Sequence, residues 1–412
     1  MSEATLVIEA LGAQGDGIAR LDDQPIYIPY TLPGETVLAN RKGAKAQLAR
    51  IEQVSPDRVD PACPHFGPRG QKCGGCSLQH MERSAYNRWK RQRVVDALMA
   101  RGIETDVAAL VACPVGSRRR AVFSAFPAKS GLVLGFNQAA TNTVIDIREC
   151  TVLLPGIVAA LPPLKRLAVE VAGRKPFRLN VLSTASGLEV RIEGRGNLPD
   201  RQRQSAIERA LQMDLARLSL DDEILIETRK PVLSIDGIDV APPPGSFFQA
   251  TEAAQNKMID TICGFLSSAG HIADLFSGCG TFSLPLARRS SVHAVESDGP
   301  ALAAASHAVR HTQGLKPLTT DRRDLFRSPL TPGELKKTDA VVFDPPRAGA
   351  QAQAQEIANS GVQKVAAVSC NPATLARDLR ILIDGGYRLL AVTPIDQFLW
   401  SHHVEAIALL ER

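Results

Sequence analysis

The stretch HIADLFSGCGTFSLPLARR, residues 271–289, decides the fold of the C-terminal part of this sequence. Its pattern predicts an apolar strand, a turn that contains Gly278 and Gly280, and then a helix. Further strand candidates alternate with helical stretches up to the C-terminal end: SVHAVE, AVVFD, KVAAVS, YRLLAVTPI and VEAIALLER. Such alternation is typical of a doubly wound parallel sheet, so we predict a Rossmann-like α/β domain over residues 246–412.

Acidic residues follow successive strands of this predicted sheet. Asp274 closes the first strand, Glu296 closes the second, Asp324 follows the third, and Asp344 begins the rigid turn DPPR after the fourth. Ligands of such sheets bind at the carboxyl ends of the strands, where an acid accepts both ribose hydroxyls of an adenosine. The turn after Asp274 lacks the third glycine of the dinucleotide fingerprint, and the sequence contains no phosphate-binding loop. S-adenosylmethionine therefore fits better than a nicotinamide or a nucleoside triphosphate.

Two residues near the C-terminal end suggest the chemistry. Cys370 ends the fifth predicted strand, in SCNP, and Glu405 begins the last strand, in HVE. A buried cysteine at a strand end is inert in most proteins. Methylation of a pyrimidine C5, however, needs a thiolate that adds to C6 and a base that removes the C5 proton. We therefore expect Cys370 to be the nucleophile and Glu405 the general base.

A cluster of cysteines lies upstream. Three of them occur in CPHFGPRGQKCGGC, and a fourth occurs far away in IRECTVL; they are Cys63, Cys73, Cys76 and Cys150. Four such ligands can close around an iron–sulfur cluster or a structural zinc, and the spacing leaves both open. A redox dithiol is the weaker alternative because no strand precedes the CxxC. The three cysteines that have no assigned role are Cys113, Cys263 and Cys279, and we expect them to pack in the core.

The N-terminal half consists mainly of short strand-like runs separated by turns, without the strand–helix alternation of the C-terminal part. Residues 1–57 contain short strands and turns that suit a small OB-like barrel, with Arg41, Lys42, Lys45 and Arg50 around one basic turn. Residues 82–101 form a basic amphipathic helix, which we expect to pack on the catalytic domain. The remainder of 58–245 predicts short strands interrupted by one helix at about 201–218.

The bulk composition sets limits on the class of protein. The sequence has 412 residues, a net charge of +5 and a pI of about 8.8, which permits a polyanionic partner. No apolar run approaches the ~18 residues that cross a bilayer, and MSEATLVIEA lacks the basic region of a signal peptide. We expect a cytoplasmic protein with no membrane contact, in which thiols stay reduced.

Taken together, these motifs resemble the RumA/TrmA family of RNA uracil-5-methyltransferases, and most closely its iron–sulfur ribosomal members of the RumA/RlmD type. The resemblance covers essentially the whole chain. GDGIAR and LPGETV are similar to the turns of a TRAM domain, and CGGCSLQH is similar to the family's cluster motif. The methyltransferase motifs are FFQ, DLFSGCGTF, DPPRAG, SCNP and HVE, of which SCNP and HVE together are highly specific.

The resemblance implies three parts: a TRAM/OB-like RNA-binding domain (1–57), a central iron–sulfur-containing α+β domain (58–245) and a methyltransferase domain (246–412). It implies catalysis by Cys370 and Glu405, and a structural [4Fe–4S] cluster on the four upstream cysteines. Cofactor residues would be Gln249, Asp274, Phe276, Gly278, Glu296, Asp324 and Asp344. The uridine would meet Phe247, Gln249 and Asp344. The implied substrate is large-subunit ribosomal RNA, bound by a monomer that needs no protein partner.

Two departures and three alternatives accompany this interpretation. The gap between Cys63 and Cys73 is longer than usual, and PIDQFLWSHHVE replaces the commoner PVDMFPQTPHVE, so we expect that loop to shape substrate choice. The same chemistry on a tRNA uridine is the first alternative. A catalytically silent iron–sulfur RNA-binding protein is the second. A DNA adenine methyltransferase is disfavoured because Arg347 occupies the place of its stacking aromatic after the prolines.

Overall fold

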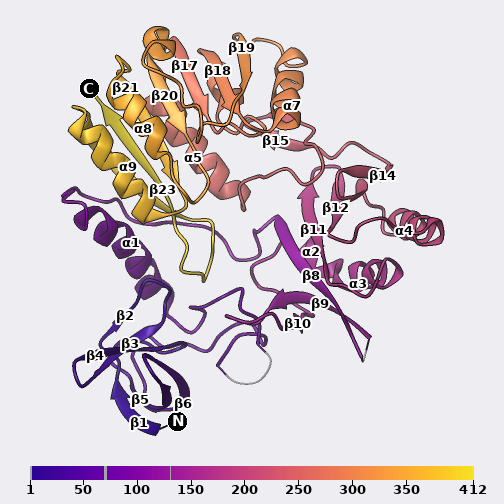
Figure 1. Ribbon diagram of the computed structural model, residues 1–412, viewed down its shortest axis with the longest axis vertical. Coiled ribbons are helices and arrows are strands. Elements are labelled where there is room, and N and C mark those ends of the chain that lie inside the picture. The colour runs from indigo at the N-terminus through magenta and orange to yellow at the C-terminus, as the bar shows by residue number, and fades with distance from the viewer. Residues whose placement is uncertain (1, 69–71, 130) are drawn as a thin grey trace.

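The structure is a computed structural model that describes residues 2–68, 72–129 and 131–412 (Figure 1). Residues 69–71 of the predicted Cys-rich segment lie outside this description. Figure 1 shows an N-terminal β unit at the bottom, a central sheet with its own helices in the middle, and a larger α/β part at the top. The chain ends in this larger part.

The large part is built on an eight-stranded sheet in the order β19-β18-β17-β20-β21-β23-β22-β7. Its first five strands in that order are mutually parallel, which confirms the predicted doubly wound arrangement. The strands are β7 (Val111–Ala112), β17 (His271–Leu275), β18 (Ser291–Glu296), β19 (Leu318–Arg322), β20 (Ala340–Phe343), β21 (Lys364–Ser369), β22 (Arg388–Asp396) and β23 (Glu405–Glu411).

The sheet departs from a purely parallel one at its β23 edge. β23 runs antiparallel to both β21 and β22. No helix separates β22 from β23, and a short connection of this kind can join only antiparallel strands. The outermost strand, β7, comes from far upstream and pairs with β22 through Ile395 and Asp396.

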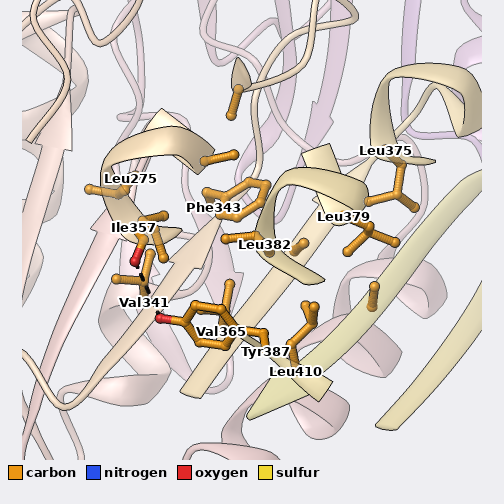
Figure 2. Close-up of a cluster of buried hydrophobic side chains, with 14 of the residues drawn as sticks. Leu275, Val341, Phe343, Ile357, Val365, Leu375, Leu379, Leu382, Tyr387 and Leu410 are labelled. Atoms are coloured by element: carbon orange, nitrogen blue, oxygen red, sulfur yellow. Dashed lines mark hydrogen bonds between the residues drawn. The ribbon is translucent and has the colours of Figure 1, made fainter. Parts of the chain in front are cut away.

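Helices cover both faces of this sheet. One face packs on α5 (Glu252–Phe265), α6 (Ser283–Leu286) and α7 (Gly299–Arg310). The other packs on α1 (Arg83–Met99), α8 (Gln351–Ala358) and α9 (Pro372–Asp384). Figure 2 shows the second layer, where Leu375, Leu379 and Leu382 of α9 lie over the strands. Their i, i+4 and i+7 spacing puts them on one helical face.

The central part is a seven-stranded sheet in the order β10-β9-β8-β11-β12-β13-β14. Its strands are β8 (Arg120–Ala128), β9 (Gly131–Asn137), β10 (Val144–Asp146), β11 (Phe177–Thr184), β12 (Gly187–Glu193), β13 (Arg217–Leu220) and β14 (Glu223–Glu227). One face packs on α2 (Pro155–Ala159), α3 (Leu161–Glu170) and α4 (Asp200–Gln212). A hairpin of β15 (Leu233–Ile235) and β16 (Ile238–Val240) then leads to the large part.

Two details of the central part differ from the sequence prediction. The helix expected at about 201–218 ends at Gln212, because Asp214 adopts a left-handed φ of 52° and β13 begins at Arg217. Helices α2 and α3 were not predicted. Both begin with proline near their N-termini, where proline's fixed φ suits the first helical turn.

The N-terminal unit is a six-stranded sheet in the order β1-β5-β6-β4-β3-β2. Its strands are β1 (Ser2–Val7), β2 (Ala10–Leu11), β3 (Gly17–Leu21), β4 (Gln24–Ile28), β5 (Thr36–Lys42) and β6 (Lys45–Gln53). The apolar run TLVIEAL, residues 5–11, is divided between two strands: the Ile8 amide donates to the Glu35 carbonyl beside β5, whereas the Glu9 amide donates to the Ile18 carbonyl of β3. The chain therefore changes partner strands after Val7.

Helix α1 connects the N-terminal unit to the large part. Its Lys90 is fully buried and donates to the carboxylate of Asp396, to the Phe398 carbonyl (3.0 Å) and to the His403 carbonyl (2.5 Å). An apolar cluster around it combines side chains from the N-terminal unit, the CxxC segment, α1 and the segment 397–404; its fully or nearly fully buried members are Leu32, Leu78, Met81, Ala85, Tyr86 and Leu399. The segment before β23 therefore packs against the N-terminal unit, the CxxC segment and α1.

None of the helices in the described ranges is both long and apolar enough to pass through a membrane.

Candidate functional site

The antiparallel pairing of β21 with β23 brings the two predicted catalytic residues together. Ser369 pairs with Ala406, so the next residue on one strand, Cys370, lies at the level of the preceding residue on the other, Glu405. The parallel neighbour β20 ends at the same edge, where Asp344 follows Phe343. A thiol and two carboxyl groups therefore meet at the carboxyl ends of the strands, which is the ligand-binding edge of such sheets.

The electrostatics of this edge favour protonated groups. The pKa of Cys370 is raised to about 11, first by burial and then by the Glu405 and Asp344 carboxylates, with Arg347 acting in the opposite direction. Burial also raises the pKa of Asp344 to about 7. The pKa of Glu405 lies well above its usual value, first because of burial and then because of the Asp344 charge. Negative charge is costly here because few water molecules can solvate it.

Hydrogen bonds connect the two carboxyl groups through two amides. Gln249 Nε2 donates to Asp344 Oδ2 (2.8 Å), and Gln397 Nε2 donates both to Gln249 Oε1 (2.8 Å) and to Glu405 Oε2 (2.5 Å). The other carboxylate oxygen of Glu405, Oε1, is buried and has no hydrogen-bond partner within the described residues. An unpaired buried acceptor of this kind is costly, so it is a candidate contact for a ligand.

Arg119 positions Gln249 from behind. Its buried guanidinium donates from Nε to the Gln249 carbonyl (3.1 Å) and from Nη2 to Gln255 Oε1 of α5 (2.7 Å). The irregular segment before α5 is thereby tied to the helix that follows it. This contact fixes the backbone from which the Gln249 amide extends.

The turn after β17 has the tight backbone expected of a cofactor loop. Phe276, Gly278 and Gly280 have φ values of 59°, 53° and 91°. A Cβ atom on Gly280 would approach Leu284 Cγ at 3.0 Å, so a larger residue there would be both strained and crowded. Glu296, at the end of β18, accepts a hydrogen bond from the Gly278 amide (3.1 Å). The acid and the glycine turn therefore face each other.

The other two acids of this group occupy different places. Asp274 is fully buried and accepts a hydrogen bond from Ser283 Oγ (2.5 Å), and burial raises its pKa to about 7. Asp274 does not line the cavity that contains the other acids of this group. Asp324 does line that cavity, and its carboxylate accepts from the Phe326 amide (3.0 Å). The rings of Phe326 and Phe276 lie 5.5 Å apart and form an apolar wall beside Asp324.

A cavity of about 830 Å³ connects these features. Its wall includes the catalytic candidates and nearly all of the cofactor candidates, and it extends to the four upstream cysteines. The predicted site residues in its wall are Cys63, Cys73, Cys76, Cys150, Phe247, Gln249, Phe276, Gly278, Glu296, Asp324, Asp344, Cys370 and Glu405. The volume is in the range of pockets that hold drug-sized ligands.

Phe247 is the most exposed aromatic side chain at this cavity, at 63%. The guanidinium of Arg120 lies 4.5 Å from its ring centre, which is a cation–π geometry. The adjacent Phe248 is buried at 1% in the core under α5, as expected for a packing residue. The two neighbouring phenylalanines therefore have opposite environments.

The four upstream cysteines, named here the cysteine quartet, are free thiols. The pKa of Cys73 is raised to about 11 and that of Cys76 to about 12, mainly by burial and in smaller part by neighbouring sulfurs of the quartet. Thiols that disfavour one another's ionisation need a compensating cation to become thiolates. Across the ranges that the structure describes, however, no three Cys, His, Asp or Glu side chains are arranged to hold a metal ion. The predicted cluster therefore stays a prediction.

The comparisons with known proteins agree with the geometry of the α/β part. The family model tRNA (Uracil-5-)-methyltransferase matches residues 209–412, and the TRAM domain model matches residues 2–40. An uncharacterized RNA methyltransferase of Agrobacterium fabrum is 51% identical over 100% of both chains. The 23S rRNA (uracil(1939)-C(5))-methyltransferase RlmD of Marinomonas posidonica is 32% identical, over 99% of this chain and 95% of that one.

The chain belongs to the uracil-5 RNA methyltransferase family. It is an RNA methyltransferase that uses S-adenosylmethionine, with a TRAM domain at its N-terminus. A solved structure of the same fold is the Pyrococcus abyssi tRNA (uracil-54, C5)-methyltransferase in complex with S-adenosyl-L-homocysteine. It has a TM-score of 0.77 and 24% identity, over 98% of this chain and 99% of that one.

Several residues of this methyltransferase site were not singled out from the sequence. Gln397, Arg119 and Phe326 contact the predicted residues but belong to no recognised motif. Among them, only Gln397 lay at a position marked as a departure, within PIDQFLWSHHVE. Cys113 and Cys279 are buried in the apolar cluster under α5, and Cys263 packs against it, so core packing describes all three.

The pH dependence of Cys370 alkylation tests this electrostatic account. Because its pKa is about 11, the thiolate fraction and the alkylation rate should rise roughly tenfold per pH unit from pH 7 to 9. Peptide mass spectrometry after iodoacetamide treatment of the ligand-free protein would measure this rate at each site. Cys370→Ser controls for peptide assignment, and a rate that is already flat above pH 7 would contradict the raised pKa.

Proposed function

We propose that the protein transfers a methyl group from S-adenosylmethionine to C5 of a uridine in large-subunit (23S) ribosomal RNA. The observation that carries the proposal is the proximity of the Cys370 thiol and the Glu405 carboxyl group at the end of β21 and β23. The 23S rRNA specificity named for the Marinomonas relative, which aligns over nearly the whole chain, supports the choice of RNA.

In the proposed mechanism, Cys370 supplies the nucleophile. Its sulfur adds to C6 of the uracil, and the C5=C6 electrons move to C5 and the C4 carbonyl, which makes C5 nucleophilic. C5 then takes the methyl group of S-adenosylmethionine, whose carbon–sulfur bond breaks and leaves S-adenosylhomocysteine. Arg347 supports the first step, because its positive charge favours the thiolate of Cys370.

Glu405 completes the reaction as the general base. It takes the C5 proton, the C5–H electrons re-form the C5=C6 double bond, and the carbon–sulfur bond breaks to release the thiolate. The unpartnered oxygen Oε1 supports this role, since it is the free acceptor at the site. The high pKa of Glu405 suits it to hold a proton once it has accepted one.

Asp344 and Phe247 serve the substrate in this proposal. The Asp344 carboxylate accepts a hydrogen bond from uracil N3–H, a donor that cytosine lacks. The uridine leaves its stack to reach the cleft, at a cost of a few kcal/mol. Phe247 holds the flipped RNA conformation, and its exposure beside Arg120 supports stacking against a base.

The cofactor occupies the glycine turn in this proposal. Gly278 and Phe276 supply the backbone turn, Glu296 accepts the ribose hydroxyls, and Asp324 meets the adenine edge. Asp274 acts from behind the wall through Ser283. The TRAM domain adds phosphate contacts through its basic turn, a term that weakens with salt.

A Glu405→Gln variant tests the mechanism and the substrate together. Wild-type protein with S-adenosylmethionine should form 5-methyluridine in a 23S rRNA transcript, measured by nucleoside mass spectrometry. The variant should instead accumulate a covalent protein–RNA adduct on denaturing gels, because the methylated ring cannot lose its C5 proton.

The controls for this experiment separate chemistry from substrate. Cys370→Ala should give neither product nor adduct. Methylation of tRNA but not of 23S rRNA would keep the mechanism and overturn the substrate. Normal turnover by Glu405→Gln would overturn the assignment of the base.

We infer further that the cysteine quartet holds a structural [4Fe–4S] cluster. The four thiols belong to the wall of the same cavity and form no disulfides, which supports this donor set. When bound, the cluster would supply cationic iron that stabilises the thiolates, and its role would be to order the segment around Cys76. No step of the methyl transfer depends on it.

Anaerobic purification tests the cluster. The wild type should contain about four iron and four sulfide per chain, the stoichiometry of the proposed cluster. Cys150→Ser should lose most of both, while the matched Cys263→Ser, at a packing position, should keep them. Stoichiometric zinc without iron would replace the proposal with a structural zinc site.

A further inference from the structure

We propose that Gln397 is a positioning residue that holds Glu405 and Gln249 in their working orientations. This inference rests on the proposed function, because it concerns how the base of that reaction is prepared. Gln397 is 2% exposed and lies in the segment between β22 and β23, eight positions before Glu405. The oxygen and the nitrogen of its side-chain amide both form hydrogen bonds within the site.

The backbone determines which way the Gln397 amide faces. Its oxygen Oε1 accepts from the Ala250 amide (2.9 Å), a backbone donor that cannot be reversed. The Nε2 group must therefore face Glu405 and Gln249, the two acceptors on its other side. A backbone contact thus removes the ambiguity of a side-chain amide, whose two ends are otherwise similar in shape.

This orientation is passed on to Gln249. Since Gln249 Oε1 accepts from Gln397, its own Nε2 is directed to Asp344. One residue thereby sets the polarity of a chain that runs from the base to the carboxylate that meets the uracil. Without Gln397, Gln249 can rotate by half a turn and present its oxygen to Asp344, where two acceptors repel.

As a consequence, the two carboxylate oxygens of Glu405 have different roles. Oε2 is occupied by the Gln397 donor, and Oε1 remains free to take the C5 proton. A donor on the ionised form stabilises that form, which opposes the effects of burial and of the Asp344 charge. The Gln397 donor therefore lowers the pKa of Glu405 relative to the same site without it, so a larger fraction of Glu405 is ionised and can act as a base.

A Gln397→Leu variant tests this role, because leucine has a similar volume but lacks the donor. Loss of a hydrogen bond to a charged group should lower kcat at pH 7 by about 10- to 100-fold. The pKa of Glu405 should rise, so the acidic limb of the kcat profile should shift to higher pH. KM for RNA should stay within about twofold.

The covalent adduct supplies a readout that a purely structural defect would not give. Methyl transfer precedes the step that needs the base, so Gln397→Leu should accumulate the methylated adduct, whereas a misfolded variant should form none. Gln397→Glu is the second variant: its added carboxyl group should repel Glu405, and its activity should recover partly at low pH. Gln355→Leu, on the exposed side of α8, is the matched control and should behave as wild type.

The outcomes are separable. Wild-type kcat and an unshifted pH profile in Gln397→Leu would overturn the inference while leaving the proposed function intact. If the variant loses turnover without accumulating adduct, Gln397 acts before methyl transfer and the inference is also wrong. Absence of 5-methyluridine with the wild-type protein on any RNA would instead overturn the proposed function.

Discussion

The buried ammonium group of Lys90 is the contact on which the active-site edge depends. It donates to Oδ1 of the Asp396 carboxylate at the end of β22 and to two carbonyls of the segment that returns to β23. Breaking such a buried pair typically costs about 3–5 kcal/mol, because the remaining charge is left without a partner. Since this segment carries Gln397 and leads directly into Glu405, the position of the base depends on helix α1, which comes from the N-terminal half.

A second constraint is the accumulation of acidic groups in one place. Asp344, Glu405 and the Cys370 thiol lie in a buried site, where both carboxylates disfavour ionisation of Cys370 and Asp344 also disfavours ionisation of Glu405. Three neighbouring side chains oppose this rise in pKa: the neutral amides of Gln249 and Gln397 donate to the carboxylates, and the positive charge of Arg347 favours the thiolate. Amides stabilise a charge without neutralising it, so the groups remain available for proton transfer.

The sequence predicted those features that have a local or periodic signal. Alternating apolar runs indicated the parallel part of the sheet, and the strand-end positions of Cys370 and Asp344 placed them at one edge. The antiparallel entry of β23 was missed, as was β7, which has only two residues and no periodicity. The bonds of Gln397 escaped detection because they link positions far apart in the chain, and Asp274 proved to face Ser283 because burial is decided by tertiary packing.

The most direct test of the central claim follows the fate of the hydrogen at C5. Purified protein is incubated with S-adenosylmethionine and a 23S rRNA transcript that carries tritium at C5 of its uridines. The account predicts one tritium released to water for each methyl group transferred, because the base must remove that atom after C5 is methylated. Methyl transfer without tritium release would place the methyl group on another atom and contradict the account.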